Sequence, residues 1–192
     1  TVVVSNSVAS TLSAASLASA AATAAVAGAS ISASDVVVQI KQVARIELAV
    51  AGKTVEEMRS ALKTMLCAAA PNCDVVSISR RALQPSGPRR LAAGSFQLTK
   101  TIDASSSDSL AAPTIDRAVV ATQLGLASSS GITTSSNLQS VEASVTVVKD
   151  GSASSDGAQA AAASAQASLP AALATGLSST GASASDFGVT TS

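Results

Sequence analysis

Two cysteines, Cys67 and Cys73, are the residues whose type and spacing allow a covalent cross-link. They stand six positions apart, with Cys67 near the end of a predicted helix and Cys73 at the start of the next predicted strand. A turn through the intervening "AAAPN" can bring the two Cα atoms within bridging distance. The spacing favours a disulfide and hence an oxidising compartment, the alternative being two buried thiols in a reducing one.

Four arginines flank a run of turn-forming residues, at Arg80, Arg81, Arg89 and Arg90. Three interpretations fit these arginines. They could belong to a solvated loop, to a dibasic site for a processing protease, or to a contact with acidic groups on a neighbouring chain.

The side chains that most enzymes and metal sites use are scarce. The chain has no His, Trp or Tyr, which removes the commonest general base and metal ligand and the usual stacking platforms for bases and sugars. Glu56 and Glu57 suit the first turn of a helix, and Asp103, Asp108 and Asp116 lack the spacing of a calcium loop. We therefore expect no metal, no cofactor and no catalysis on other molecules.

The overall composition argues against nucleic acid and membranes as partners. Twelve basic and twelve acidic residues cancel, so the excess of Lys and Arg that polyanions attract is missing. Residues 8–29 are mostly Ala, with a few Val and Leu, broken by Ser and Thr, which favours a packed helix over a membrane span. Ala and Ser together make up roughly two-fifths of the chain, so its core must rely on close contacts, staples or neighbouring chains.

The segment between residues 44 and 83 predicts a strand, a helix and a second strand. "ARIELAVAG" alternates apolar with charged side chains and ends at Gly52, which indicates a strand. "KTVEEMRSALKTMLCAAAP" indicates a helix with Thr54 as its N-cap and Pro71 at its end. "CDVVSISRRAL" then indicates a short strand, followed by the turn residues "QPSGP".

The segment from 94 to 151 completes the pattern. "GSFQLTKTID" predicts a strand, and "SDSLAAPTIDRAVVATQLGLASSSG" predicts a second helix with an apolar stripe of Ile115, Val119 and Leu126. "SVEASVTVVKDG" predicts the last strand. The order βαββαβ predicts an α+β fold of the ferredoxin-like type, a four-stranded antiparallel sheet with two helices on one face.

The two flanks repeat part of this pattern. "SASDVVVQ" at 32–39 and "SASDFGVTT" at 183–191 each follow an Ala/Ser-rich run, as "PNCDVVSI" follows the central helix. We predict a partial repeat of strand, helix and strand over 1–42, the central domain over 43–149, and a partial repeat of helix and strand over 150–192. The alternative is low-complexity sequence that looks alike by chance.

The βαββαβ order, together with "GSFQL" at the start of its third strand, resembles the SEA domain, an extracellular module of mucin-like and adhesion proteins. "RRLAAG" before an apolar strand is also similar to Ala/Ser-rich surface proteins of algae and other protists, including those of flagellar hairs. The SEA resemblance covers about 43–149 and implies self-cleavage between Gly94 and Ser95. The Ser95 hydroxyl would attack the Gly94 carbonyl under strain, and water would hydrolyse the ester. The polar Gln97 and the long preceding loop depart from that pattern, so an intact joint is favoured.

Two functional hypotheses follow. The first is a structural piece of an extracellular filament, coat or flagellar hair, assembled by strand addition with copies of itself or neighbouring repeats. The second is an adhesion or spacer module at the cell surface, cleaved at Gly94-Ser95 and in contact with other surface glycoproteins. The many Ser and Thr residues are candidate attachment sites for O-linked sugars.

Overall fold

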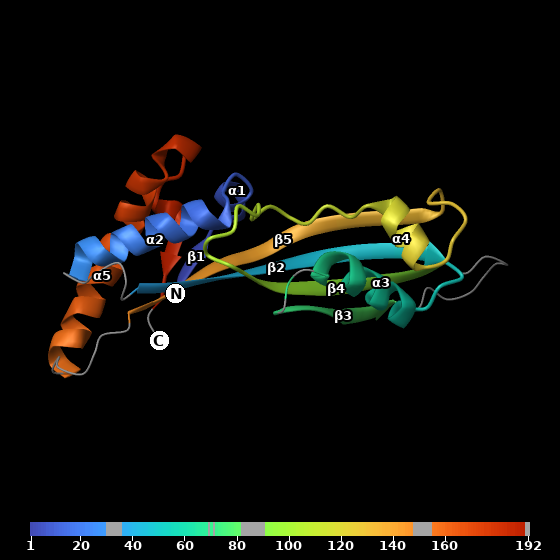
Figure 1. Ribbon diagram of the computed structural model, residues 1–192, viewed down its shortest axis with the longest axis horizontal. Helices are drawn as coiled ribbons and strands as arrows, with labels where there is room; N and C mark the ends of the chain where they lie inside the picture. Colours follow the sequence, from blue (N-terminus) through green and yellow to red (C-terminus); the bar gives the residue numbers. More distant parts are fainter. Residues whose placement is uncertain (30–35, 69, 71, 82–90, 148–154, 191–192) are drawn as a thin grey trace. The chain divides into compact units, whose positions relative to one another are not determined.

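The structure, a computed structural model, describes residues 1–29, 36–68, 70, 72–81, 91–147 and 155–190. In these residues the chain is α+β, with a six-stranded antiparallel sheet in the order β3-β4-β2-β5-β1-β6 and several helices (Figure 1). The elements, in chain order, are β1 (Val2–Val4), α1 (Asn6–Ala9), α2 (Ala14–Ala29), β2 (Val36–Ala51), α3 (Val55–Cys67), β3 (Cys73–Arg81), β4 (Leu91–Ile102), α4 (Arg117–Gln123), β5 (Ile132–Val147), α5 (Ser155–Gly176), the 3₁₀ turns η2 (Ser178–Thr180) and η3 (Ala184–Asp186), and β6 (Phe187–Val189).

The chain divides into two compact units. Unit 1 comprises Thr1–Lys41, Ile102–Ala111 and Ser140–Ser192, and unit 2 comprises Gln42–Thr101 and Ala112–Gln139. The long strands β2 and β5 contribute residues to both units. The segments before and after the central region, which the sequence presents as two separate flanks, thus belong to one unit.

Unit 2 has the strand order β3-β4-β2-β5, and its core lies between that sheet and helices α3 and α4. Every second residue of β2 from Ala44 to Val50 is buried, whereas Arg45 and Glu47 lie on the opposite face. This alternation is the expected consequence of the two-residue period of a strand. The buried core residues are Ala44, Ile46, Leu48, Val50, Met58, Ala61, Leu62, Val75, Phe96, Leu98, Val120, Ala121, Leu124 and Ile132.

Helix α3 forms as its sequence predicts. The Thr54 hydroxyl accepts a hydrogen bond from the Glu57 N–H, and the Glu57 carboxylate accepts one from the Thr54 N–H, which completes a capping box. Met58 and Leu62, one turn apart on the same face of the helix, are fully buried. The helix ends at Cys67, before Pro71.

The second predicted helix, expected to have Pro113 near its start and Gly131 just past its end, is wrong in extent, because α4 covers only Arg117–Gln123. The Asp116 carboxylate accepts a hydrogen bond from the Ala118 N–H and fixes the start of α4. Leu110 lies outside the helix, and its N–H donates a hydrogen bond of 3.0 Å to the Leu12 carbonyl. Of the predicted stripe, Ile115 and Leu126 are partly buried against the core, whereas Val119 is 38% exposed and its neighbour Val120 is buried instead.

The last predicted strand begins earlier than expected. Strand β5 starts at Ile132, where "ITTSSNLQ" supplies β-branched residues and buries Ile132 and Leu138 on one face. Its serines and asparagine resemble a loop by composition, but here they occupy a strand. β5 therefore runs for 16 residues, as does β2.

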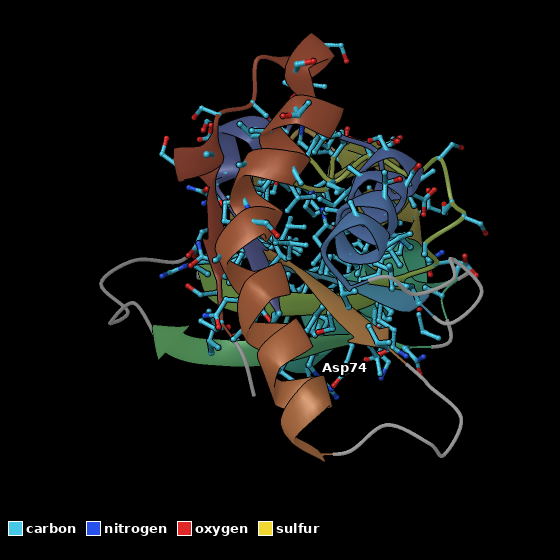
Figure 2. The ribbon with its side chains drawn as sticks, turned by 90° about the vertical axis from the view of Figure 1, so that its left-hand side faces the viewer. Asp74 is labelled. Carbon is cyan, nitrogen blue, oxygen red and sulfur yellow. A yellow bond between two sulfur atoms is a disulfide. The ribbon has the colours of Figure 1, made fainter. Side chains whose placement is uncertain are left out.

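Unit 1 contains both the first and the last strands of the described chain, β1 and β6. Strand β1 pairs antiparallel with β5 and with β6, so that Val3 lies opposite Glu142 on one side and Gly188 on the other. Helices α2 and α5 pack side by side (Figure 2). A Cβ added to Gly176 would lie 3.4 Å from the Ala20 Cβ, which shows how closely small residues let these helices approach.

Candidate functional site

Gly94 and Ser95 lie inside a strand and not at its beginning. Strand β4 starts at Leu91, so the prediction that the third central strand begins at Gly94 is wrong by three residues. Gly94 pairs with Arg80 and Ser95 pairs with Ser79 across the β3–β4 ladder. The peptide proposed for cleavage is therefore part of a paired antiparallel ladder.

The glycine at position 94 makes room for an aromatic ring. A Cβ added there would lie 2.6 Å from Cζ and 2.7 Å from Cε2 of Phe96, whose side chain is fully buried. The backbone of Gly94 lies outside the left-handed region, so the unusual φ expected for a strained site is not present at this residue. A strand glycine covered by a neighbouring aromatic ring is a known way of stabilising a sheet.

Ser95 belongs to a polar cluster on the face of unit 2 opposite its core. Its hydroxyl donates a hydrogen bond of 2.6 Å to Oε2 of Glu47, and the other oxygen of Glu47 accepts one of 2.7 Å from Nε of Arg45. Nη2 of Arg45 also lies 3.5 Å from the Ser95 hydroxyl. Ser95 is 8% exposed, whereas the Arg45 and Glu47 side chains are about half exposed. The arrangement can hold a serine hydroxyl against a carboxylate, the first requirement for activating it.

Sequence reasoning missed the partnership of Arg45 and Glu47 with Ser95. Alternation in β2 does place Arg45 and Glu47 together on the outer face. Their contact with Ser95, however, depends on β4 lying next to β2, and this neighbour is set by the tertiary fold. A pattern in one strand cannot identify the strand beside it.

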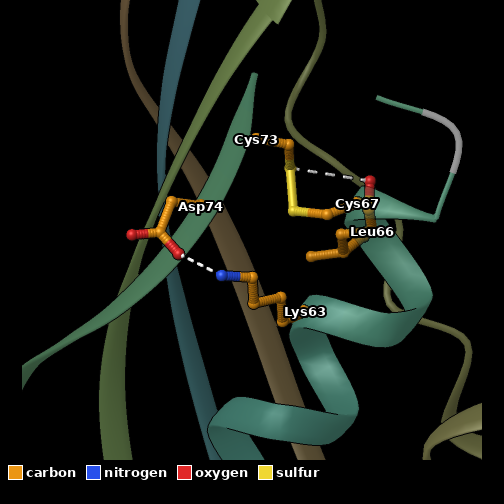
Figure 3. Close-up of a disulfide and its surroundings, with 5 residues drawn as sticks. All are labelled: Lys63, Leu66, Cys67, Cys73 and Asp74. Atoms are coloured by element: carbon orange, nitrogen blue, oxygen red, sulfur yellow. Dashed lines mark hydrogen bonds and ion pairs between the residues drawn. A yellow bond between two sulfur atoms is a disulfide. The ribbon is translucent and has the colours of Figure 1, made fainter. Parts of the chain in front are cut away.

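The disulfide predicted between Cys67 and Cys73 is confirmed (Figure 3). The Cα atoms are 5.3 Å apart, and the bridge links the end of α3 to the start of β3. Beside it, Nζ of Lys63 lies 2.9 Å from Oδ1 of Asp74. The hydrogen bond from Lys63, followed by one from the Val75 N–H, lowers the pKa of Asp74. The bridge and this ion pair both tie the start of β3 to α3.

Strand β3 stands at one end of the strand order and exposes apolar side chains. Val76 and Ile78 are 42% and 46% exposed, while Val75 is fully buried against the core. The pairing register shifts between Ser77 and Ser79, which marks a bulge in this edge strand.

The predicted arginines fall at the limits of the described chain. Arg80 and Arg81 are the last two residues of β3 and pair with Gly94 and Ala93. Arg89 and Arg90 lie outside the described residues.

The described ranges hold no metal cluster and no membrane-spanning helix. They contain no cluster of three or more His, Cys, Asp or Glu side chains able to hold a metal ion. Among the helices described, none is both long and apolar enough to cross a membrane. Comparison of the chain with protein-family models, with curated proteins and with solved structures found no match.

Proposed function

We propose that this chain is a structural subunit of an extracellular filament, coat or flagellar hair, built from ferredoxin-like units of the SEA type. The strand order of unit 2, β3-β4-β2-β5, supports this architecture. It places the first and third strands of the βαββαβ pattern in the middle and the second and fourth strands outside, with α3 and α4 packed on one face.

Unit 1 has the same pattern when its strands are taken in chain order. β1, α2 and β2 form its first half, and β5, α5 and β6 form its second half, with the strand order β2-β5-β1-β6. The two flanks are therefore two halves of one unit, and unit 2 is inserted between them. The repeat-to-repeat contact expected between neighbouring chains is made here within one chain, by β1 with β6 and by α2 with α5.

The packing of unit 1 suits a durable structural part. Its helices bury Leu17, Ala21 and Leu173 completely, and its sheet buries Val2 and Val141. Many of the buried residues of this unit are alanines, and Phe187 is its one buried aromatic side chain among the described residues. In unit 2 the Cys67–Cys73 disulfide supports an oxidising, extracellular location.

The observation that carries the assembly role is the outer side of β3. An edge strand has unpaired backbone groups, and proteins usually protect such edges with charges, bulges or covering elements. β3 has a bulge, yet it also exposes Val76 and Ile78. Exposed apolar side chains on an open edge favour addition of a strand from another molecule.

Electron microscopy of the native material tests this function. We expect filaments, a coat or hairs that contain this chain as a regularly repeated part. Native material in which the chain occurs only as separate, single particles would contradict the proposal.

A second function is favoured by the hydrogen bond from Ser95 to Glu47. In this alternative the chain is a cell-surface module that cuts itself. The Ser95 hydroxyl attacks the Gly94 carbonyl carbon, its proton passes to the leaving peptide nitrogen, and water then hydrolyses the ester to a free Gly94 carboxylate and the Ser95 hydroxyl. Mass spectrometry of denatured protein decides the matter. Two fragments meeting at Gly94-Ser95, absent in Ser95→Ala, support cleavage, and an intact chain contradicts it.

A further inference from the structure

The hydrogen bond from Ser95 to Glu47 is not a local turn or cap contact. Ser105 and Asp103 make such a local contact, between residues two positions apart in an exposed turn. Ser95 and Glu47 are instead 48 positions apart, on the neighbouring strands β4 and β2, and their oxygens are 2.6 Å apart. Ser95 is also only 8% exposed. Because the backbone ladder already holds β4 against β2, local structure does not account for this bond.

The Glu47 carboxylate is fixed in the orientation that accepts from Ser95. Its Oε1 accepts a hydrogen bond of 2.7 Å from Nε of Arg45, while Oε2 accepts the one from the Ser95 hydroxyl. A separation of 2.6 Å is in the short range typical of a hydroxyl that donates to a charged carboxylate. Nη2 of Arg45 lies 3.5 Å from the same hydroxyl. A positive charge at this place favours loss of the hydroxyl proton.

The peptide before Ser95 lacks the unusual backbone geometry on which a strain-driven cleavage depends. Gly94 and Ser95 pair with Arg80 and Ser79 in the β3–β4 ladder, and the φ of Gly94 lies outside the left-handed region. Without strain, the hydroxyl must be activated by a base, because a neutral serine is a weak nucleophile. The carboxylate of Glu47 is in hydrogen-bond contact with that hydroxyl and is placed to act as the base.

We propose that Glu47 is the proton acceptor for Ser95, so that cleavage between Gly94 and Ser95 is base-assisted. The inference rests on the second function proposed above, and it names a catalytic residue for that reaction. It also replaces strain, which the sequence resemblance implies, with a base as the means of activating the serine.

Each step of this route balances within the cluster. The proton of the Ser95 hydroxyl moves to Oε2 of Glu47 as Oγ bonds to the Gly94 carbonyl carbon. The bond from that carbon to the Ser95 nitrogen then breaks, and the nitrogen takes the proton from Glu47. Water next attacks the ester while Glu47 accepts a proton from it, and the leaving Ser95 oxygen regains that proton. The products are a Gly94 carboxylate and a Ser95 amine, with Glu47 unchanged.

A time course of the full chain, followed by mass spectrometry of denatured samples, tests the role of Glu47. We expect fragments that meet at Gly94-Ser95 to accumulate in the wild type. Glu47→Gln should slow their formation about 100-fold or more, since a general base contributes that much. Glu47→Asp retains a carboxylate and should keep part of the rate. Glu56→Gln is the matched control, because Glu56 pairs with Arg59 on α3, and it should cleave as the wild type does.

Chemical rescue separates the catalytic role of Glu47 from a structural one. Glu47→Ala leaves room for a small carboxylate beside Ser95, so added formate should restore cleavage in this variant. Formate should restore nothing in Ser95→Ala, which lacks the nucleophile. Circular dichroism shows that each variant folds, so that loss of folding is not mistaken for loss of the base. A folded Glu47→Ala chain that gains nothing from formate contradicts the proposal.

The inference and the function on which it rests fail in different ways. A folded Glu47→Gln chain that cleaves at the wild-type rate overturns the base and leaves self-cleavage standing. A wild-type chain that stays intact overturns both, and the bond from Ser95 to Glu47 is then a structural contact between β4 and β2.

Discussion

Replacing Gly94 by alanine places a methyl group where the Phe96 ring lies. The new Cβ would stand 2.6 Å from Cζ of Phe96, about 1 Å inside an ordinary carbon–carbon contact. Phe96 is fully buried, so its ring cannot turn into solvent to relieve the overlap. Overpacking of this kind costs about 1–3 kcal/mol. Lower entropy of the unfolded chain offsets about 0.4–1 kcal/mol of that.

The expected net effect of Gly94→Ala is a loss of about 1–2 kcal/mol in the free energy of unfolding, or about 5 °C in midpoint temperature. Thermal unfolding followed by far-UV circular dichroism measures it, and hydrogen exchange shows whether unit 2 is the part that loosens. Gly131→Ala is the matched control, because a Cβ at Gly131 meets nothing within 4 Å. The control should change stability by less than about 0.5 kcal/mol.

A second substitution separates packing from other roles of Gly94. Phe96→Leu removes part of the ring that the new methyl group would meet. Combined with Gly94→Ala it should cost less than the sum of the two single changes, because the two residues are in contact. If Gly94→Ala proves as harmless as Gly131→Ala, or if the two changes simply add, the packing explanation of Gly94 is wrong.

Three further outcomes follow from the structure. Removing the disulfide with Cys67→Ser and Cys73→Ser should lower the free energy of unfolding by about 2 kcal/mol, because the unfolded chain is no longer closed into a loop with sequence separation 6. Urea titrations of this variant and of the reduced wild type should give the same midpoint. An unchanged midpoint would contradict a stabilising role of the disulfide. Thr54→Ala removes the capping box of α3 and should cost about 1 kcal/mol, whereas Thr54→Ser should retain most of the stability in the same titration. Hydrogen bonds from Ser183, and then from Ser5, lower the pKa of Asp186 below its reference value of 3.8, so its contribution is present above pH 3.8 and is lost as the pH falls through the lower folded value. Asp186→Asn should therefore reduce the loss of stability between pH 4 and pH 2, and an unaltered acid titration by circular dichroism speaks against this role.

The elements of unit 2 whose signals lie within one short segment of sequence could be predicted. In α3, the N-cap Thr54 and the buried Met58 and Leu62 follow from spacing alone, and the disulfide follows from the positions of two cysteines around a turn. The strand character of β2 likewise follows from its alternation. Each of these signals lies within one short segment.

The parts that failed depend on residues distant in sequence. Leu110 leaves the predicted helix because it bonds to Leu12, nearly a hundred positions away in the chain. Thr133 and Ser135 look like loop residues until the neighbouring strand makes them part of a sheet. The pairing of β1 with β6, and the contact of Ser95 with Glu47, likewise require the strand order. Segments rich in Ala and Ser show little contrast between apolar and polar positions, so the sequence pattern does not indicate which distant segments pair.

Electron microscopy of the native material, with this chain identified in the density or by a bound antibody, tests the structural role most directly. The account predicts a filament, coat or hair in which the chain recurs at a regular spacing. Isolated single particles of the chain, with no regular association in the native material, would contradict it.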